Sequence, residues 1–132
     1  MAEALRVLVV DDDDVARECV QRSLARVEAP TEMVPARDGL EALSILRGEH
    51  PHLAIAEPLI VLLDLNMPRM NGCEFLDALR NDEALRDCTV YVLTSSTLER
   101  DRALAEERGV AGFLPKTGGP ALTQHLRALL RS

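Results

Sequence analysis

Residues 59–72 read LIVLLDLNMPRMNG, and this stretch decides the fold class. Its first five residues form an unbroken apolar run, which is typical of a strand buried on both faces of a parallel sheet. Asp64 ends the run, and Asn71 and Gly72 precede a helical pattern that starts around Phe75. The stretch therefore predicts a buried strand, a polar loop and then a helix.

The same alternation of strand and helix continues on both sides of this stretch. Strands are expected at residues 7–10, 31–36, 59–63, 90–93 and 112–114, and helices at 16–27, 40–46, 75–79, 98–108 and 120–130. Pro35 predicts an edge position for the second strand, and Asp13 or Asp14 is expected to cap the first helix. Gly109 and Pro120 are expected to end the fourth helix and to open the fifth. Five strand–helix units predict a parallel sheet covered by helices on both faces.

Length and composition limit the classes of protein that this chain can belong to. It has 132 residues with 22 Asp+Glu and 15 Lys+Arg, which gives a net charge of −7. One domain covering residues 1–132 is expected from the length, and the negative charge disfavours direct binding of nucleic acid. The longest apolar run has five residues, whereas a membrane span needs about twenty. No signal peptide is visible at the N-terminus.

The cysteines indicate neither a zinc site nor a disulfide framework. Cys19, Cys73 and Cys88 are odd in number and far apart, and no CxxC pair occurs. Free thiols in a reducing compartment are the expected state, which predicts a cytoplasmic protein.

Polar residues follow four of the five predicted strands. Asp11 to Asp14 follow the first strand, Asp64 the third, Thr94 the fourth and Lys116 the fifth. Ligands of open α/β sheets bind beyond the carboxyl ends of the strands, so we expect these side chains to converge on one rim. Each of them has an ordinary alternative interpretation as a cap, a turn residue or a solvated loop residue. Their joint position at consistent strand ends favours a binding site.

The predicted rim would bring several carboxylates together. Two of Asp11, Asp12 and Asp64 at about 4 Å would repel each other by about 4 kcal/mol at an effective dielectric constant near 20. Either a proton is taken up or a cation binds, and carboxylate oxygens suit Mg²⁺. With Lys116 as a fixed positive charge and the hydroxyl of Thr94 as a donor, the set indicates a site that holds a phosphoryl group on or near Asp64.

Four segments resemble the receiver domain of two-component response regulators. They are VLVVDDDD at 7–14, LIVLLDLNMPRMNG at 59–72, VYVLTSS at 90–96 and GFLPK at 112–116, and the resemblance covers about residues 6–131. It implies an α/β, flavodoxin-like three-layer sandwich with a parallel sheet in the order 2-1-3-4-5. It also implies a signalling protein that catalyses only its own phosphorylation and dephosphorylation. The donor would be a phosphohistidine of a sensor histidine kinase or a phosphotransfer protein.

The resemblance also implies roles for individual residues. Asp64 would be the phosphoacceptor, Asp12 would bind Mg²⁺ directly, and Asp11 would bind it through water or as a second carboxylate. Asn66 would offer its backbone carbonyl to the metal ion. With no effector domain expected after the fifth helix, output would pass through phosphorylation-dependent partner binding or a phosphorelay.

Further roles concern the phosphoryl oxygens and the output. Thr94 and Lys116 would each bind one phosphoryl oxygen, and Phe113 occupies the aromatic switch position that turns inward when Thr94 moves. Residues 98–108, Phe113 and residues 120–131 would form an output surface or a homodimer surface.

The sequence departs from the family pattern at three places. The family usually has proline after the lysine, but Thr117 stands there, and a cis bond before threonine would cost about 3 kcal/mol. Phe113 lacks the hydroxyl of the commoner tyrosine. Residues 48–58, GEHPHLAIAEP, are longer than a usual connection. They are expected either to extend the second helix or to form an interaction loop, similar to that of phytochrome-associated stand-alone receivers.

Three other classes of protein share parts of this pattern. A dinucleotide-binding fold requires GxGxxG after the first strand, where four aspartates would here repel a pyrophosphate. A haloacid-dehalogenase-like phosphatase needs a second aspartate two residues after Asp64, where this chain has Asn66. A pseudo-receiver would keep the fold without phosphorylation; the full Asp, Thr and Lys set argues against it, whereas Thr117 leaves it open.

Overall fold

The computed structural model describes residues 5–28, 30–51, 59–65, 70–94, 99–116 and 119–130. In these residues five strands alternate with five helices. The elements are β1 (Leu5–Val10), α1 (Asp14–Ala25), β2 (Thr31–Ala36), α2 (Gly39–Leu46), β3 (Leu59–Asp64), α3 (Gly72–Asn81), β4 (Val90–Thr94), α4 (Glu99–Glu107), β5 (Gly112–Pro115) and α5 (Gly119–Leu130).

All strand pairs are parallel, and the sheet order is β2-β1-β3-β4-β5. The flavodoxin-like order predicted from the sequence is therefore confirmed. β2, which contains Pro35, lies at one edge of the sheet, as expected for a strand that lacks one backbone donor.

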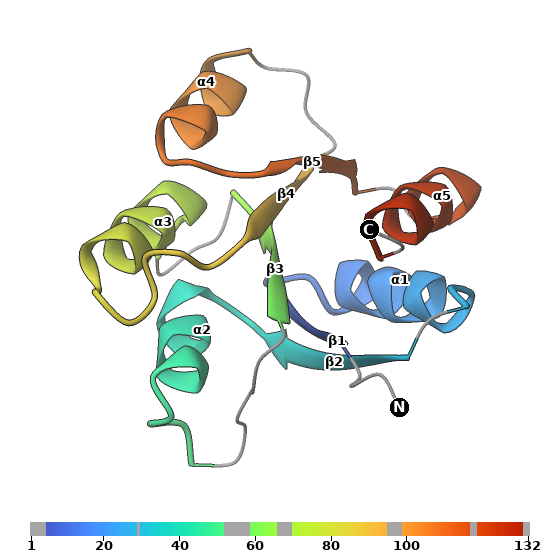
Figure 1. Cartoon of the computed structure of the whole chain (residues 1–132), viewed down its shortest axis with the longest axis horizontal. Helices are drawn as coiled ribbons and strands as arrows, with labels where there is room; N and C mark the ends of the chain where they lie inside the picture. Colours follow the sequence, from blue (N-terminus) through green and yellow to red (C-terminus); the bar gives the residue numbers. More distant parts are fainter. Residues whose placement is uncertain are drawn as a thin grey trace.

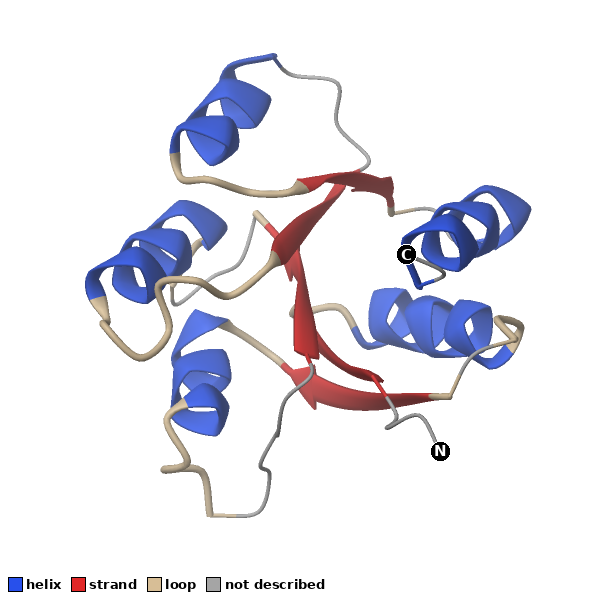
Figure 2. Ribbon diagram, viewed as in Figure 1, coloured by secondary structure: helices blue, strands red, loops and turns tan. Residues whose placement is uncertain are grey.

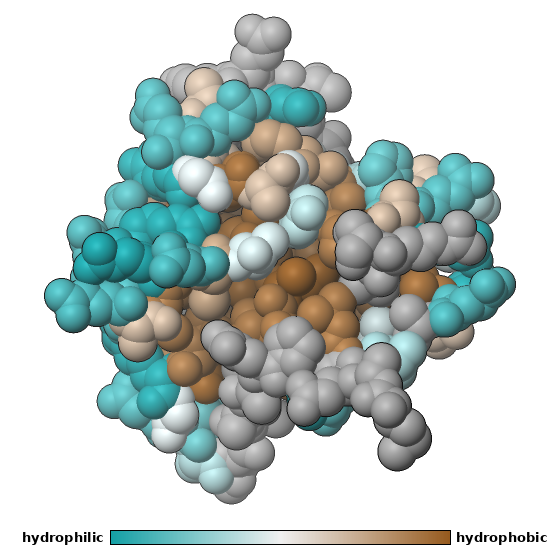
Figure 3. Space-filling model, viewed as in Figure 1, coloured by the Kyte–Doolittle hydropathy of each residue, from teal (hydrophilic) through white to brown (hydrophobic). Residues whose placement is uncertain are grey.

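The sheet lies between two layers of helices. Helices α1 and α5 cover one face, and α2, α3 and α4 cover the other (Figures 1 and 2). Alternate residues of β1 face opposite layers: Leu8 and Val10 pack with α2 and α3, whereas Val7 and Val9 pack with α1 and α5. All four side chains are fully buried, which explains why the strand reads as a continuous apolar run. Figure 3 shows hydrophilic residues over the outer helices and hydrophobic residues in the middle of that face.

Short polar side chains start the helices next to the sheet's carboxyl edge. The Asp13 carboxylate accepts a hydrogen bond from the backbone N–H of Val15, so Asp13 is the N-cap of α1. Asp38 caps α2 in the same way, and Asn71 caps α3 in a reciprocal capping box. These caps fix where each helix leaves the loops that carry the polar rim.

Helices α2 and α4 are each followed by a glycine with a positive φ. α2 ends at Leu46 with Arg47 as its C-cap, and Gly48 has a positive φ of 72°. Residues 47–51 therefore do not extend the helix, and residues 52–58 lie outside the described residues. Gly109 has a φ of 73° after α4, as expected for a glycine at a helix end. In the described residues, no helix has both the length and the apolar character to cross a membrane.

Candidate acidic site at the carboxyl edge of the sheet

The two central strands place the acidic side chains at one edge. Asp11 directly follows β1, and Asp64 is the last residue of β3. The preceding residues, Val10 and Leu63, are paired partners in the sheet. Strands β3 and β4 each extend one residue further than the sequence pattern indicated, so Asp64 and Thr94 are the last residues of their strands. Parallel pairing therefore brings residues more than fifty positions apart to the same rim.

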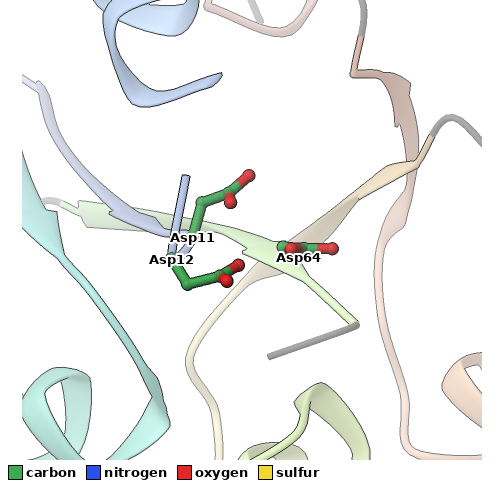
Figure 4. Close-up of side chains that lie close together, drawn as sticks. All are labelled: Asp11, Asp12 and Asp64. Carbon is green, nitrogen blue, oxygen red and sulfur yellow. The ribbon is translucent and has the colours of Figure 1, made fainter. Parts of the chain in front are cut away.

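Three carboxylates meet at this rim. One oxygen each of Asp11, Asp12 and Asp64 lie within 4.8 Å of one another. In Figure 4 the Asp12 carboxylate extends toward the end of β3 that carries Asp64, and Asp11 projects from the same turn beside it. Asp11 is 0% exposed and Asp64 is 4% exposed, whereas Asp12 is open to solvent. The arrangement combines two buried anions with one that faces water.

This donor set fits a hard divalent cation. Oxygen ligands at such spacing suit Mg²⁺ or Mn²⁺, which keep several waters when only a few carboxylates bind them. The buried Oδ2 of Asp11 makes no hydrogen bond to any described residue. A divalent cation would further compensate the charge of this buried carboxylate, since burying a charge is costly unless it is paired.

Lys116 brings a positive charge to the same cluster. Its Nζ lies 3.1 Å from Oδ2 of Asp64 and 3.3 Å from Oδ2 of Asp11. The backbone N–H of Lys116 donates to the carbonyl of Thr94 at 3.1 Å, which holds the end of β5 beside the end of β4. Lys116 is also the only lysine in the sequence.

Burial and charge act in opposite directions on these groups. Burial is the main reason that the pKa of Asp11 is raised; the Asp64 charge adds to it, while the Asp13 N–H and Lys116 oppose it. Burial alone would lower the pKa of Lys116, but the carboxylates of Asp64 and Asp11 outweigh it and leave that pKa raised. The ammonium therefore stays charged and offsets part of the negative charge of the rim.

A residue of α1 that the sequence reasoning missed contacts the turn between β1 and α1. The guanidinium of Arg17 donates to the backbone carbonyl of Asp11 and to the carboxylate of Asp14. The spacing of three residues between Asp14 and Arg17 on a helix is a readable signal for an ion pair. The contact with the Asp11 carbonyl has no sequence signal, because it depends on the path of the turn.

Of the remaining predicted site residues, the structure describes Thr94 and Phe113. Thr94 is half-buried at the end of β4, beside Lys116. Phe113 is half-buried on β5, and the guanidinium of Arg102 lies over its ring, 4.4 Å from the ring centroid. Asn66 and Thr117 lie outside the described residues.

Comparison with known proteins agrees with this fold. Residues 7–127 match the family model of the response regulator receiver domain. The chain therefore belongs to the family of response regulator receiver domains. The Response regulator MprA of Mycobacterium sp. (strain KMS) is 35% identical over 128 residues, which are 96% of this chain and 51% of that protein. The chain thus spans about half the length of this curated relative.

Two solved structures are similar over nearly the whole chain. The phosphorylated cyanobacterial phytochrome response regulator RcpA has a TM-score of 0.83 at 30% identity, covering 96% of this chain and 91% of its own. The Mn²⁺-bound form of response regulator Rcp1 has a TM-score of 0.78 at 28% identity, covering 94% and 90%. Family and fold together define a receiver-type signalling domain. The dinucleotide-binding and phosphatase alternatives therefore have no support.

Proposed function

We propose that the chain accepts a phosphoryl group on Asp64 with the help of Mg²⁺. The ion would be held by the carboxylates of Asp11, Asp12 and Asp64 and by the backbone carbonyl of Asn66. The observation that carries the proposal is the meeting of three carboxylates within 4.8 Å, beside a lysine ammonium 3.1 Å from Asp64. The phosphorylated RcpA and the Mn²⁺-bound Rcp1, both similar in fold, support it.

Each residue of the rim would have a different role in phosphoryl transfer. A carboxylate oxygen of Asp64 attacks phosphorus in line with a phosphohistidine nitrogen of a sensor kinase or phosphotransfer protein. The P–O bond forms while the P–N bond breaks, and the imidazole keeps the electron pair of that bond. Lys116 pairs with one phosphoryl oxygen, and the hydroxyl of Thr94 donates to another. Mg²⁺, when bound, supplies further neutralisation of charge on the phosphoryl oxygens.

Labelling with acetyl phosphate tests the acceptor. With Mg²⁺ present, the wild type is expected to gain the mass of one phosphoryl group, and Asp64→Asn is expected to gain none. Asp38→Asn is the matched control, since Asp38 is also buried at this edge and asparagine also caps a helix. Labelling of Asp64→Asn would show that the acceptor is misassigned. A wild type that takes up no label would favour a pseudo-receiver.

The metal ligand Asp12 has its own test. Asp12→Ala removes the one solvent-facing carboxylate of the cluster while leaving the buried pair intact. We expect weaker Mg²⁺ binding in a calorimetric titration and slower labelling at a fixed Mg²⁺ concentration. Unchanged metal affinity would reject Asp12 as a ligand.

Output is proposed to pass from Thr94 to Phe113. A phosphoryl group on Asp64 would draw the Thr94 hydroxyl inward and favour the inward position of the Phe113 ring, which is a shift between two populations. The half-buried ring now lies under the guanidinium of Arg102. The surface that receives the change would be residues 98–108, Phe113 and residues 120–131, where a partner or a second copy would bind.

The Phe113 ring provides a direct readout of this step. Beryllofluoride with Mg²⁺, which mimics the phosphoryl group, is expected to shift the NMR signals of the Phe113 ring in the wild type but not in Asp64→Asn. Arg102→Ala removes a contact of about 0.5–1 kcal/mol and should shift those signals partway even without beryllofluoride. A ring that ignores beryllofluoride in the wild type would refute the switch. Sedimentation with and without the mimic tests the homodimer.

A further inference from the structure

Local hydrogen bonds in the turn between β1 and α1 hold the carboxylates of Asp11, which is in the cluster, and Asp13, which is not. Oδ1 of Asp11 accepts a hydrogen bond from the backbone N–H of Asp13 at 2.9 Å, and the Asp13 carboxylate accepts one from Val15 at 2.9 Å. The backbone N–H of Asp11 donates to the carbonyl of Ala36 at 3.0 Å. The side chains of Asp11 and Asp13 are therefore held by local bonds.

Asp12 is held differently. Among the described residues, no hydrogen bond or ion pair fixes its exposed carboxylate, although that carboxylate lies in the cluster. Its direction therefore depends on the backbone from which it projects. The peptide plane between Asp11 and Asp12 is rigid, so any bond to the Asp11 carbonyl sets the orientation of this plane.

Arg17 supplies that bond. From the second turn of α1 its guanidinium reaches back, and Nη1 donates to the Asp11 carbonyl while Nη2 donates to the Asp14 carboxylate. The Arg17 side chain is only 13% exposed. A planar guanidinium can hold two acceptors at once in a fixed geometry, which an ammonium cannot do. One side chain thus ties both ends of the acidic turn to the helix.

We infer that Arg17 is a positioning residue for the divalent cation: it fixes the Asp11–Asp12 peptide so that the Asp12 carboxylate stays within the cluster. The inference rests on the proposed metal site. It predicts an effect opposite in sign to simple electrostatics. A positive charge near a cation site repels the cation, so charge alone would make loss of Arg17 tighten binding, by roughly 2- to 5-fold. Loss of a positioning contact instead weakens metal binding, by roughly 10-fold.

The test measures Mn²⁺ and Mg²⁺ binding by calorimetry, together with acetyl phosphate labelling as a function of Mg²⁺ concentration. Arg17→Met is expected to bind both ions roughly 10-fold more weakly and to label at a normal rate once Mg²⁺ saturates. Arg17→Lys keeps the charge but not the fork, and should weaken binding by roughly 3-fold while rescuing part of the loss. Arg22→Met removes an exposed charge of the same helix and should change affinity by less than about 2-fold.

The outcomes separate the alternatives. Tighter or unchanged binding in Arg17→Met overturns the inference, and so does a lower labelling rate at saturating Mg²⁺ with normal affinity. A wild type that binds neither ion overturns the proposed metal site and the inference with it. Circular dichroism reports folding of each variant. If Arg17→Met does not fold, Arg17→Lys decides: weakened binding supports the positioning role, and unchanged affinity overturns it.

Discussion

The ammonium of Lys116 lies 3.1 Å from Oδ2 of Asp64, so a cation from the end of β5 neutralises a carboxylate from the end of β3 across the intervening strand β4. The same ammonium lies 3.3 Å from Oδ2 of Asp11. Its positive charge and a divalent cation would occupy neighbouring parts of one acidic cluster. If Asp64 accepts a phosphoryl group as proposed, Lys116 would oppose metal binding by repulsion while it assists the chemistry of that group.

Lys116→Met should separate these two effects. Removing the repelling charge is expected to raise Mg²⁺ affinity by roughly 3- to 10-fold. Labelling by acetyl phosphate at saturating Mg²⁺ should fall by roughly 100-fold, because one phosphoryl oxygen loses its partner. Lys116→Arg keeps the charge and should retain nearly normal Mg²⁺ affinity. Weaker metal binding in Lys116→Met would contradict the assigned geometry.

The wild-type lysine can be observed directly. Lys116 is the only lysine in the chain, so labelling lysine with ¹³C at the ε position gives one side-chain NMR signal. That signal is expected to shift when Mg²⁺ is added and again when beryllofluoride is added. An unchanged signal would mean that the ammonium does not lie at the metal and phosphoryl site.

Gly72 supports the loop that follows Asp64. A Cβ atom added to Gly72 would lie 2.6 Å from the Cα of Leu65, a backbone atom that cannot rotate away. Gly72→Ala is therefore expected to destabilise the protein by about 1–3 kcal/mol in urea unfolding, and to slow labelling because Leu65 adjoins Asp64. Gly112→Ala is the control, since its Cβ would meet only the Tyr91 ring at 3.4 Å. Equal stability of Gly72→Ala and wild type would refute the close approach.

Much of the fold and rim could be predicted from the sequence, because both follow from local patterns. Continuous apolar runs such as residues 59–63 identify strands buried on both faces, and the parallel topology brings their carboxyl ends together. Asp11, Asp12, Asp64 and Lys116 could therefore be placed on one rim before their distances were known. Strand ends shifted by one residue, as is usual where hydrogen bonding defines them.

What could not be predicted depends on geometry between elements. Arg17 reaches a backbone carbonyl, and Arg102 lies over the Phe113 ring, yet neither contact has a residue pattern of its own. The path after α2 was also ambiguous, since residues 48–58 fit either an extension of the helix or an interaction loop. The end of α2 at Leu46 and the positive φ of Gly48 show that residues 47–51 do not extend the helix. Arginine contacts with carbonyls are the class of interaction that sequence reasoning misses here.

Arg80 is the largest example of such a contact. Its guanidinium, on α3, donates four hydrogen bonds of 2.8–3.0 Å to backbone carbonyls: those of Arg86, Cys88, Arg108 and Gly109. One side chain thus joins the loop before β4 to the end of α4. The carbonyls of Arg108 and Gly109 lie just beyond the end of α4, where no further helical turn supplies donors, and the Arg80 guanidinium supplies them.

Replacing Arg80 should therefore destabilise the loop before β4 and the end of α4 together. Arg80→Met is expected to lower the free energy of unfolding by about 2 kcal/mol. Hydrogen exchange of amides around residues 86–88 and 108–110 should also rise. Arg86→Met is the matched control: among the described residues, the Arg86 side chain makes only an exposed ion pair with Glu83 at 3.9 Å, and its loss should cost less than about 0.5 kcal/mol. Equal losses in the two variants would disprove the special role of Arg80.

Glu41 on α2 should make the free energy of unfolding depend on pH. Its Oε1 accepts the backbone N–H of Arg37 at 2.8 Å, and its Oε2 lies 3.2 Å from Nε2 of His50. Burial alone would raise the pKa of Glu41, but the Arg37 N–H, His50 and the Arg37 charge outweigh it and leave the pKa below the usual 4.5. A carboxylate with a lowered pKa stabilises the folded state above its unfolded pKa, and this contribution is lost as the pH falls through its folded pKa.

Glu41→Gln isolates this contribution, since the amide oxygen can still accept the Arg37 N–H while the charge is gone. Above about pH 5, the free energy of unfolding of the wild type should exceed that of the variant by about 1 kcal/mol. The difference should then shrink toward zero as the pH falls below about 4.5. Urea unfolding at a series of pH values measures it, with the exposed Glu28→Gln as control. A gap between wild type and Glu41→Gln that stays constant down to about pH 3 would show that the Glu41 charge contributes nothing to folding.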